Sequence, residues 1–115
     1  MPDSSPQARL VLTSAGSSRQ AGMLAQSLVE ERLAACVTVL RGAESVYRWK
    51  EQIESANESV LLIKTTEEQL AALEKRLKEL HIYETPEFLV LKVDAGSADY
   101  LAWLQSSVGP ALSES

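Results

Sequence analysis

The sequence is poor in the residue types that most catalytic and metal sites require. Its 115 residues include one cysteine, Cys36, one histidine, His81, and one asparagine, Asn57. A single cysteine excludes an intrachain disulfide and a cysteine-rich metal cage, and it agrees with a reducing compartment. The glycine motifs of nucleotide-binding proteins, the GxSxG motif and cysteine pairs at metal spacing are also absent. These absences predict a protein that binds and assembles, not an enzyme.

Positive charge and long apolar runs are scarce as well. The chain has 11 Lys and Arg against 16 Asp and Glu, a net charge of −5, which disfavours a nucleic-acid or anionic-membrane partner. The first residues lack the positive and apolar regions of a secretory signal, and the apolar runs are too short to cross a bilayer. We therefore expect a cytoplasmic protein with no nucleic-acid and no membrane partner.

Hydrophobic periodicity predicts one domain with three helices and four strands. Residues 1–7 and 107–115 are expected to be a disordered N-terminus and a flexible C-terminus, around a single domain at 8–106. Helices are expected after Ser17, Thr66 and Ser97, the first two with Gln three residues on as in a capping box. The predicted strands cover 9–14, 35–40 continued by 45–49, 60–65, and 88–93, with a bend near Gly42 and a turn at 55–57.

The order of these elements predicts the fold class. It is β-α-β-β-α-β plus a C-terminal helix, which is the α+β, ferredoxin-like split β-α-β architecture with an antiparallel sheet. Right-handed crossovers place both helices on one face of such a sheet. The strands at 60–63 and 88–93 are apolar at consecutive positions, so they favour burial on both faces. We therefore expect a homo-oligomer in which copies of the chain cover the bare face.

Three features are candidates for a site, and each has an alternative structural explanation. Cys36 lies in a predicted strand, where a thiol is either an inert core residue or a metal or redox group. Tyr47 and Trp49 alternate with cations along a strand, and they form either an interface pair or one wall of a ligand cleft with Arg48 as an anion contact. The segment 81–87 combines an imidazole, a phenol and two carboxylates in a loop, where sites are common. A helix-terminal histidine followed by a solvated turn explains it equally well.

Five ordered motifs within about residues 8–105 resemble the CutA divalent-cation tolerance family. They are Leu33-Ala34-Ala35-Cys36-Val37, Ser45-Val46-Tyr47-Arg48-Trp49, Leu61-Leu62-Ile63-Lys64-Thr65-Thr66, His81-x-Tyr83-Glu84-x-Pro86-Glu87 and Tyr100-Leu101-x-Trp103-Leu104. The resemblance implies a ferredoxin-like homotrimer, similar in architecture to PII signalling proteins that bind small ligands between subunits. It also implies the site residues. The metal-linked positions are Cys36, Glu58 and His81, and the cleft positions are Tyr47, Trp49, Lys64, Tyr83, Glu84 and Glu87.

The first functional hypothesis is therefore a trimeric divalent-cation tolerance protein that responds to metal ions. It has no obligatory cofactor and binds Cu(II) or a similar divalent cation. The alternative is a PII-like trimer that senses a small molecule or acts as a scaffold for a protein partner. An acylphosphatase-like enzyme shares the order of elements but needs a catalytic Arg and Asn, and Asn57 is expected in a turn that offers no such loop.

Overall fold

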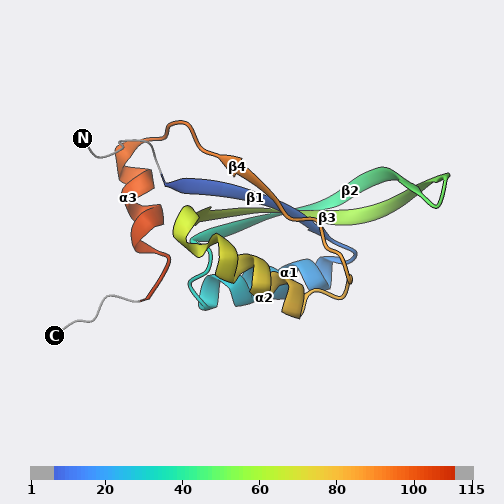
Figure 1. Ribbon diagram of the computed structural model, residues 1–115, viewed down its shortest axis with the longest axis horizontal. Helices are drawn as coiled ribbons and strands as arrows, with labels where there is room; N and C mark the ends of the chain where they lie inside the picture. Colours follow the sequence, from blue (N-terminus) through green and yellow to red (C-terminus); the bar gives the residue numbers. More distant parts are fainter. Residues whose placement is uncertain (1–6, 111–115) are drawn as a thin grey trace.

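The computed structural model describes residues 7–110 and contains the elements that the sequence predicts, in the predicted order (Figure 1). These elements are β1 (Ala8–Ala15), α1 (Ser18–Glu30), β2 (Cys36–Trp49), β3 (Gln52–Thr66), a 3-10 turn η1 (Glu67–Gln69), α2 (Leu70–Leu80), β4 (Leu89–Lys92) and α3 (Ala98–Ser106). The strands form one antiparallel sheet in the order β2-β3-β1-β4. This arrangement confirms the α+β, ferredoxin-like fold.

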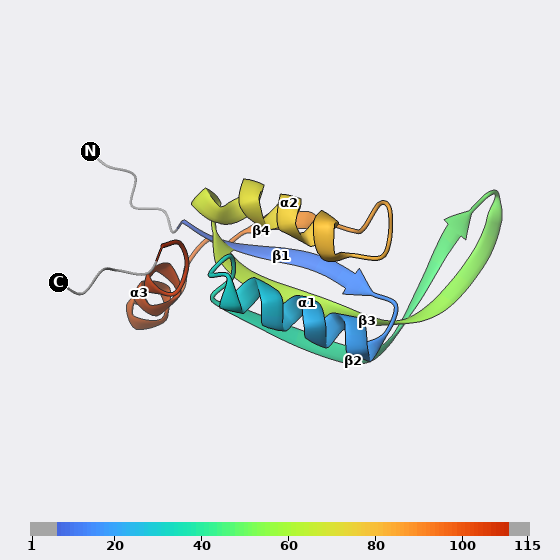
Figure 2. The ribbon, with the colours of Figure 1, turned by 90° about the horizontal axis from the view of Figure 1, so that it is seen from below.

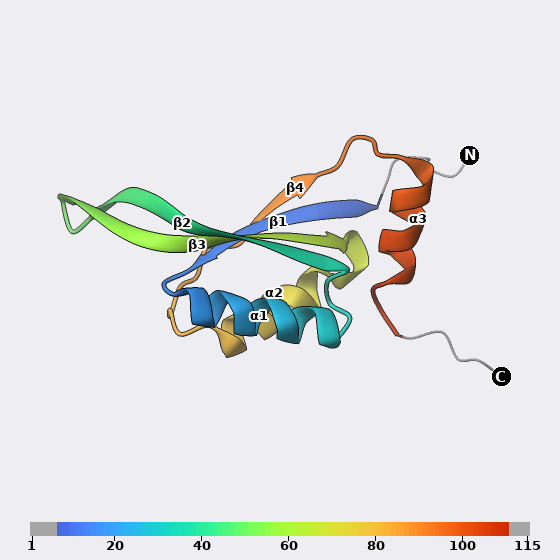
Figure 3. The ribbon, with the colours of Figure 1, turned by 180° about the vertical axis from the view of Figure 1, so that it is seen from behind.

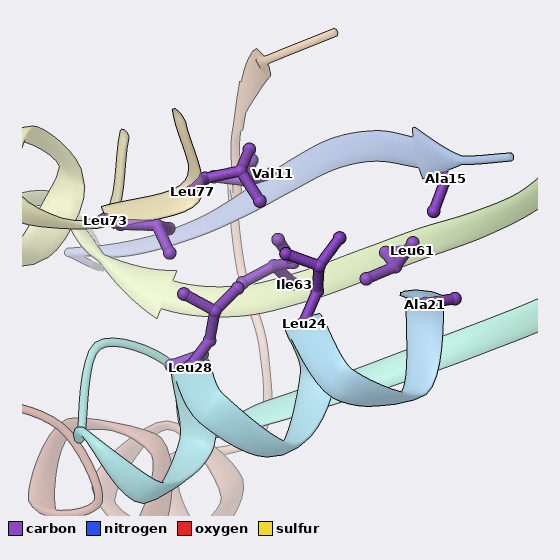
Figure 4. Packing of buried hydrophobic residues seen from close by; sticks show 10 residues of the cluster. Val11, Ala15, Ala21, Leu24, Leu28, Leu61, Ile63, Leu73 and Leu77 are labelled. Atoms are coloured by element: carbon purple, nitrogen blue, oxygen red, sulfur yellow. The ribbon is translucent and has the colours of Figure 1, made fainter. Parts of the chain in front are cut away.

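Both long helices cover one face of the sheet. Figure 2 shows α1 and α2 side by side across the strands, and Figure 4 shows their leucines meeting the inward residues of β1 and β3. The cluster contains ten fully buried side chains, including Leu24 and Leu28 of α1, Leu73 and Leu77 of α2, and Ile63 of β3. Fully burying one such side chain contributes about 1.5–3 kcal/mol. This core joins both helices to the sheet whose ends carry the loops.

The opposite face of the sheet has no helix over its middle (Figures 1 and 3). Leu40, Leu89 and Leu91 are about half exposed, at 50%, 55% and 47%, and Val90 on the other side of β4 is 44% exposed. Strand β4 pairs only with β1 among the described strands and therefore forms an edge. A face and an edge this apolar are typical of surfaces that another protein chain covers.

Strands β2 and β3 continue far beyond the helices as a two-stranded arm (Figures 1 and 3). A register shift lies between Leu40 and Ala43, where Gly42 has a φ of +76° that other residues rarely adopt. Such a bulge bends the strand and increases its twist. The predicted long strand with a bend near Gly42 is confirmed.

The turn predicted at 55–57 is wrong, because these residues belong to β3 and Asn57 pairs with Glu44 of β2. The hairpin turns instead at Lys50 and Glu51, whose φ angles are +49° and +68°. Two residues with positive φ match the twist of an antiparallel hairpin. Asn57 is therefore a strand residue and not the turn residue that we expected when we set aside an acylphosphatase-like enzyme.

Ser17 and Ser97 cap their helices as predicted, accepting hydrogen bonds from the backbone N–H groups of Gln20 and Tyr100 at 3.1 and 3.3 Å. Thr66 does not. Its buried hydroxyl has no hydrogen-bond partner among residues 7–110, and η1 lies between it and α2. The capping box predicted at Thr66 is wrong, although the helix that follows is present.

Helix α3 closes the end of the sheet away from the arm (Figures 1 and 3). Its Leu104 packs with Ala8, Ala35 and Val108 in a second apolar cluster. Gly109 donates a backbone hydrogen bond to the Arg32 carbonyl at 2.9 Å, so the chain stays in contact with the domain beyond Ser106. The outer parts of the predicted termini, 1–6 and 111–115, lie outside the described residues. No helix within residues 7–110 is long and apolar enough to span a membrane.

Candidate functional site: an acidic and aromatic cleft

A cleft of about 800 Å³ lies between the root of the arm and the loop that follows α2. Its volume falls within the range of about 300–1,000 Å³ that is common for small-molecule sites. The lining residues come from β1, β2, β3 and the loop, and they are Ser14, Ser45, Val46, Tyr47, Trp49, Ala56, Glu58, Tyr83, Glu84, Thr85 and Glu87. Five of the six predicted cleft residues are among them, and Lys64 is the exception.

The bulge at Gly42 explains how the aromatic residues of β2 reach the cleft. Before the bulge Leu40 pairs with Val60, and after it Ala43 pairs with Glu58. Paired residues lie on the same face of a sheet. Before the bulge the even-numbered residues of β2 share the face of Glu58, and the extra residue gives that face to the odd-numbered residues after it. Tyr47 and Trp49 therefore face the cleft. Arg48 pairs with Ile53 on the other face and does not line the cleft, so the interpretation of Arg48 as an anion contact of this cleft is wrong.

His81 holds the cleft loop against the end of β1. The imidazole is 7% exposed. Its Nδ1 accepts a hydrogen bond from the backbone N–H of Tyr83 at 3.0 Å, and its Nε2 lies 2.8 Å from the carbonyl oxygen of Ser14. A carbonyl can only accept and an N–H can only donate, so Nδ1 is the acceptor and Nε2 is the donor in these two contacts. Both ring nitrogens are thereby occupied by backbone groups.

Glu58 is the acceptor at the centre of the cleft wall. The hydroxyl of Ser14 donates to its Oε2 at 3.2 Å, and the phenol of Tyr83 donates to the same atom at 3.4 Å. Burial raises the pKa of Tyr83 above 10.0, and the negative charge of Glu58, its hydrogen bond with the phenol, and Tyr47 raise the pKa further. Tyr83 therefore stays a neutral donor at physiological pH.

Gly16 is part of this arrangement, because a Cβ at this position would lie 2.7 Å from the Tyr83 hydroxyl oxygen. Ser14 and Gly16 were not among the predicted site residues. Their only signal was their position, at and just beyond the end of the first strand, because nothing in their residue types indicates a contact with residue 83.

Cys36 and Lys64 lie elsewhere. They pair across β2 and β3, and the Lys64 ammonium is 3.7 Å from the Cys36 sulfur and 2.6 Å from the Thr38 hydroxyl oxygen. Lys64 is six residues from Glu58 along β3, which corresponds to about 20 Å of strand. Within one chain, Glu58 and His81 thus lie at one end of the sheet and Cys36 near the other.

The predicted metal set does not come together in one subunit. Among residues 7–110, no three His, Cys, Asp or Glu side chains lie close enough to hold a metal ion. Cys36 is too distant, and His81 would have to release one of its backbone partners to bind an ion. Of the three predicted donors, Glu58 alone presents its side chain to the cleft. The described part of one chain therefore supplies isolated carboxylates and no closed chelate.

Comparison with known proteins places these observations in a family. The sequence profile described as "CutA1 divalent ion tolerance protein" matches residues 9–107. A divalent-cation tolerance protein CutA from Pectobacterium atrosepticum is 46% identical over 99 residues, covering 86% of this chain and 90% of the relative. The one from Thermus thermophilus is 41% identical over 100 residues, covering 87% of this chain and 97% of the relative.

Solved structures give the same result. The divalent cation tolerance protein from Thermus thermophilus superimposes with a TM-score of 0.87 at 40% identity, covering 89% of this chain and 99% of that one. CutA1 from Oryza sativa gives a TM-score of 0.89 at 34% identity, covering 95% and 100% of the two chains. The structural similarity thus extends over most of the chain.

Proposed function

Because the chain belongs to the CutA1 divalent ion tolerance family, we propose that it serves divalent-cation tolerance as a homotrimer that binds Cu(II) or a similar divalent cation weakly at the cleft. The observation that carries this proposal is the charge of the lining. Glu58, Glu84 and Glu87 line the cleft, and none of them forms an ion pair with any of residues 7–110. A cleft lined by charges of one sign concentrates ions of the opposite sign.

Weak binding follows from the donors that one chain can offer. Divalent cations bind tightly only when several donors converge with suitable geometry, and the described residues of one chain bring no three such side chains together. Glu58 is the first contact in this proposal, because its carboxylate lies in the cleft wall. Water or a second subunit completes the coordination. Cys36 contributes only if another subunit brings a donor to it.

Assembly is proposed from the uncovered surfaces of the sheet. Leu89 and Leu91 extend the bare face onto the edge strand β4, and burying apolar surface is the main driving force of association. The number of subunits, three, comes from the resemblance to the family. Light scattering should give about three times the chain mass of 12.6 kDa. A stable monomer at micromolar concentration would contradict the proposal.

Calorimetry tests the metal site itself. We propose titrating CuCl₂ into the wild type, Glu58→Gln, His81→Ala and the control Glu68→Gln, whose exposed carboxylate lies in η1 away from the cleft. Glu58→Gln should weaken binding, and Glu68→Gln should not. If His81→Ala gives the wild-type isotherm, His81 is not a ligand. If Glu58→Gln also leaves the isotherm unchanged, the cleft is not the metal site.

A second candidate function is supported by a different observation, the aromatic wall formed by Tyr47, Trp49 and Tyr83. A divalent metal ion is bound through oxygen, nitrogen or sulfur donors, whereas a small organic ligand also packs against aromatic rings. This candidate is a PII-like trimer that binds a small molecule and acts through a protein partner. Since a ligand stabilises the form to which it binds, a compound that raises the melting temperature in a metal-free buffer would support it. Stabilisation by metal ions alone would count against it.

A further inference from the structure

We infer that the cleft binds an organic ammonium ion with an apolar body, held between the aromatic rings of Tyr47, Trp49 and Tyr83 and the carboxylates of Glu58, Glu84 and Glu87. This inference rests on the second proposed function, the binding of a small ligand, and not on the binding of a metal ion. It names the chemical class of ligand from the charge, the surface and the size of the cleft.

The charge of the cleft selects a cation. Three carboxylates line it, and among its described lining residues there is no Lys, Arg or His. A phosphate or carboxylate ligand would therefore meet three like charges and no cationic lining residue, which costs binding free energy. The pKa of Tyr83 is raised first by burial and then by the negative charge of Glu58, which disfavours a phenolate beside it. The field that disfavours a phenolate favours an ammonium group.

The aromatic rings select a cation that carries apolar groups. Aromatic faces attract ammonium groups within about 6 Å of the ring centre, and cages of such rings recognise quaternary ammonium ligands. The Trp49 ring already takes part in one such contact, with the Lys50 ammonium 5.8 Å from its centroid. In the single chain Tyr47 and Trp49 are 45% and 60% exposed, so both present ring surface to the cleft.

The size of the cleft argues in the same direction. Its volume is about 800 Å³, whereas one water molecule occupies roughly 30 Å³ of the liquid. A bare divalent ion would fill a small part of this space and leave the three rings without a role. An ammonium ion with several carbon atoms can contact the rings and the carboxylates at the same time, so both kinds of lining residue would take part in binding.

The test compares two probes that differ only in charge. Choline and its neutral isostere 3,3-dimethylbutan-1-ol have nearly the same shape, so the difference between them measures the contribution of the positive charge. We propose calorimetric titration of both into the full chain, with EDTA present to remove divalent cations. Choline should bind about tenfold more tightly than the isostere, and its affinity should fall as salt is raised.

Three variants locate the binding. Trp49→Leu and Glu58→Gln should each weaken choline binding about two- to fivefold. The control, Ile53→Ala, removes an apolar side chain that is 64% exposed on the other face of the same arm, and it should change nothing. The exposure of Trp49 makes its replacement compatible with folding, and a melting curve of each variant verifies this.

The outcomes separate this inference from the metal proposal. Equal affinity for the two probes, no choline binding up to millimolar concentration, or equal loss in Ile53→Ala and Trp49→Leu would each overturn the inference. Because EDTA is present, none of these results bears on Cu(II) binding. A negative CuCl₂ titration together with tight, Trp49-dependent choline binding would leave this inference standing and remove the divalent ion from the cleft.

Discussion

The Nδ1 atom of the His81 side chain accepts a hydrogen bond from the backbone N–H of Tyr83 at 3.0 Å. Their rings also lie close, with centroids 4.7 Å apart. The other ring nitrogen of His81 donates to the Ser14 carbonyl, so one imidazole connects the end of β1 to the loop that supplies Tyr83 and Glu84. His81 is therefore a positioning residue for the cleft.

Replacing His81 by Ala should destabilise the protein and loosen the cleft loop. The substitution removes the hydrogen-bond partner of the part-buried Ser14 carbonyl and that of the Tyr83 N–H, and losing these two hydrogen bonds together costs about 1–3 kcal/mol. We expect the free energy of unfolding, measured by urea denaturation, to fall by about that amount. His81→Asn retains one donor and one acceptor and should lose less. An unchanged denaturation midpoint for His81→Ala would show that these hydrogen bonds do not hold the loop.

The ionisation of Tyr83 should make stability depend on alkaline pH. Its pKa is raised from 10.0 in the folded protein, first by burial and then by Glu58, so the folded state binds the phenolic proton more tightly than the unfolded state. This contribution to the free energy of unfolding is fully present below pH 10 and is lost as the pH rises through the folded-state pKa. Unfolding measured at several pH values above 9 should show a steeper loss in the wild type than in Tyr83→Phe.

Glu58→Gln provides the matched test of the cause. Removing the carboxylate removes the second cause of the shift and leaves burial in place. In a spectrophotometric titration of the phenol groups, the transition assigned to Tyr83 by comparison with Tyr83→Phe should move toward lower pH but stay above 10.0. No movement would show that Glu58 does not act on Tyr83.

Gly16→Ala should disturb the cleft without much effect on the fold. The new methyl group would lie 2.7 Å from the Tyr83 hydroxyl oxygen, and the far end of this partly exposed side chain can move aside. The hydrogen bond from Tyr83 to Glu58 should break, so the pKa of Tyr83 should fall while the melting temperature changes little. Gly22→Ala is the control for the pKa of Tyr83, because a Cβ there meets nothing closer than 3.9 Å. Gly22 lies inside α1, so this variant should leave that pKa unchanged and raise stability slightly. A large loss of stability in Gly16→Ala alone would mean that the backbone, not Tyr83, resists the methyl group.

The elements that bury apolar side chains could be predicted from the sequence. The leucines of α1 and α2 recur at helical spacing and form the core, so local pattern and tertiary packing agree and both helices were found. The strand at 60–65 was found for the same reason, because Leu61 and Ile63 are fully buried. These positions are determined by the burial of apolar side chains, and the spacing of apolar residues is visible in a single sequence.

The arm could be predicted only in part, because its residues bury little. Residues 52–58 of β3 contain no apolar alternation that distinguishes a strand from a turn, and Ser55-Ala56-Asn57 has turn-forming composition. Pairing with β2 overrides that local preference. Five of the six predicted cleft residues line the cleft and Lys64 does not, and these five were found because they belong to the motifs of a family. The convergence of Ser14, Glu58 and Tyr83 depends on three separated segments, and the residue types alone gave no indication of it.

The turn of the arm offers a last prediction, because it contains neither glycine nor asparagine. Lys50 and Glu51 both have positive φ, a conformation that costs about 1–2 kcal/mol for an ordinary L-residue. The double substitution Lys50→Asn, Glu51→Gly places the preferred residues in this two-residue loop. We expect the free energy of unfolding to rise by about 1 kcal/mol, since the greater freedom of glycine in the unfolded chain offsets part of the relief.

The double variant Lys50→Ala, Glu51→Ala separates backbone strain from charge, because it removes both charges and keeps side chains that resist positive φ. It should show no gain in stability. An equal gain in the two double variants would assign the effect to charge. Both variants also remove the Lys50 ammonium from the Trp49 ring, so if that ring binds cations, both should bind choline at least as tightly as the wild type does.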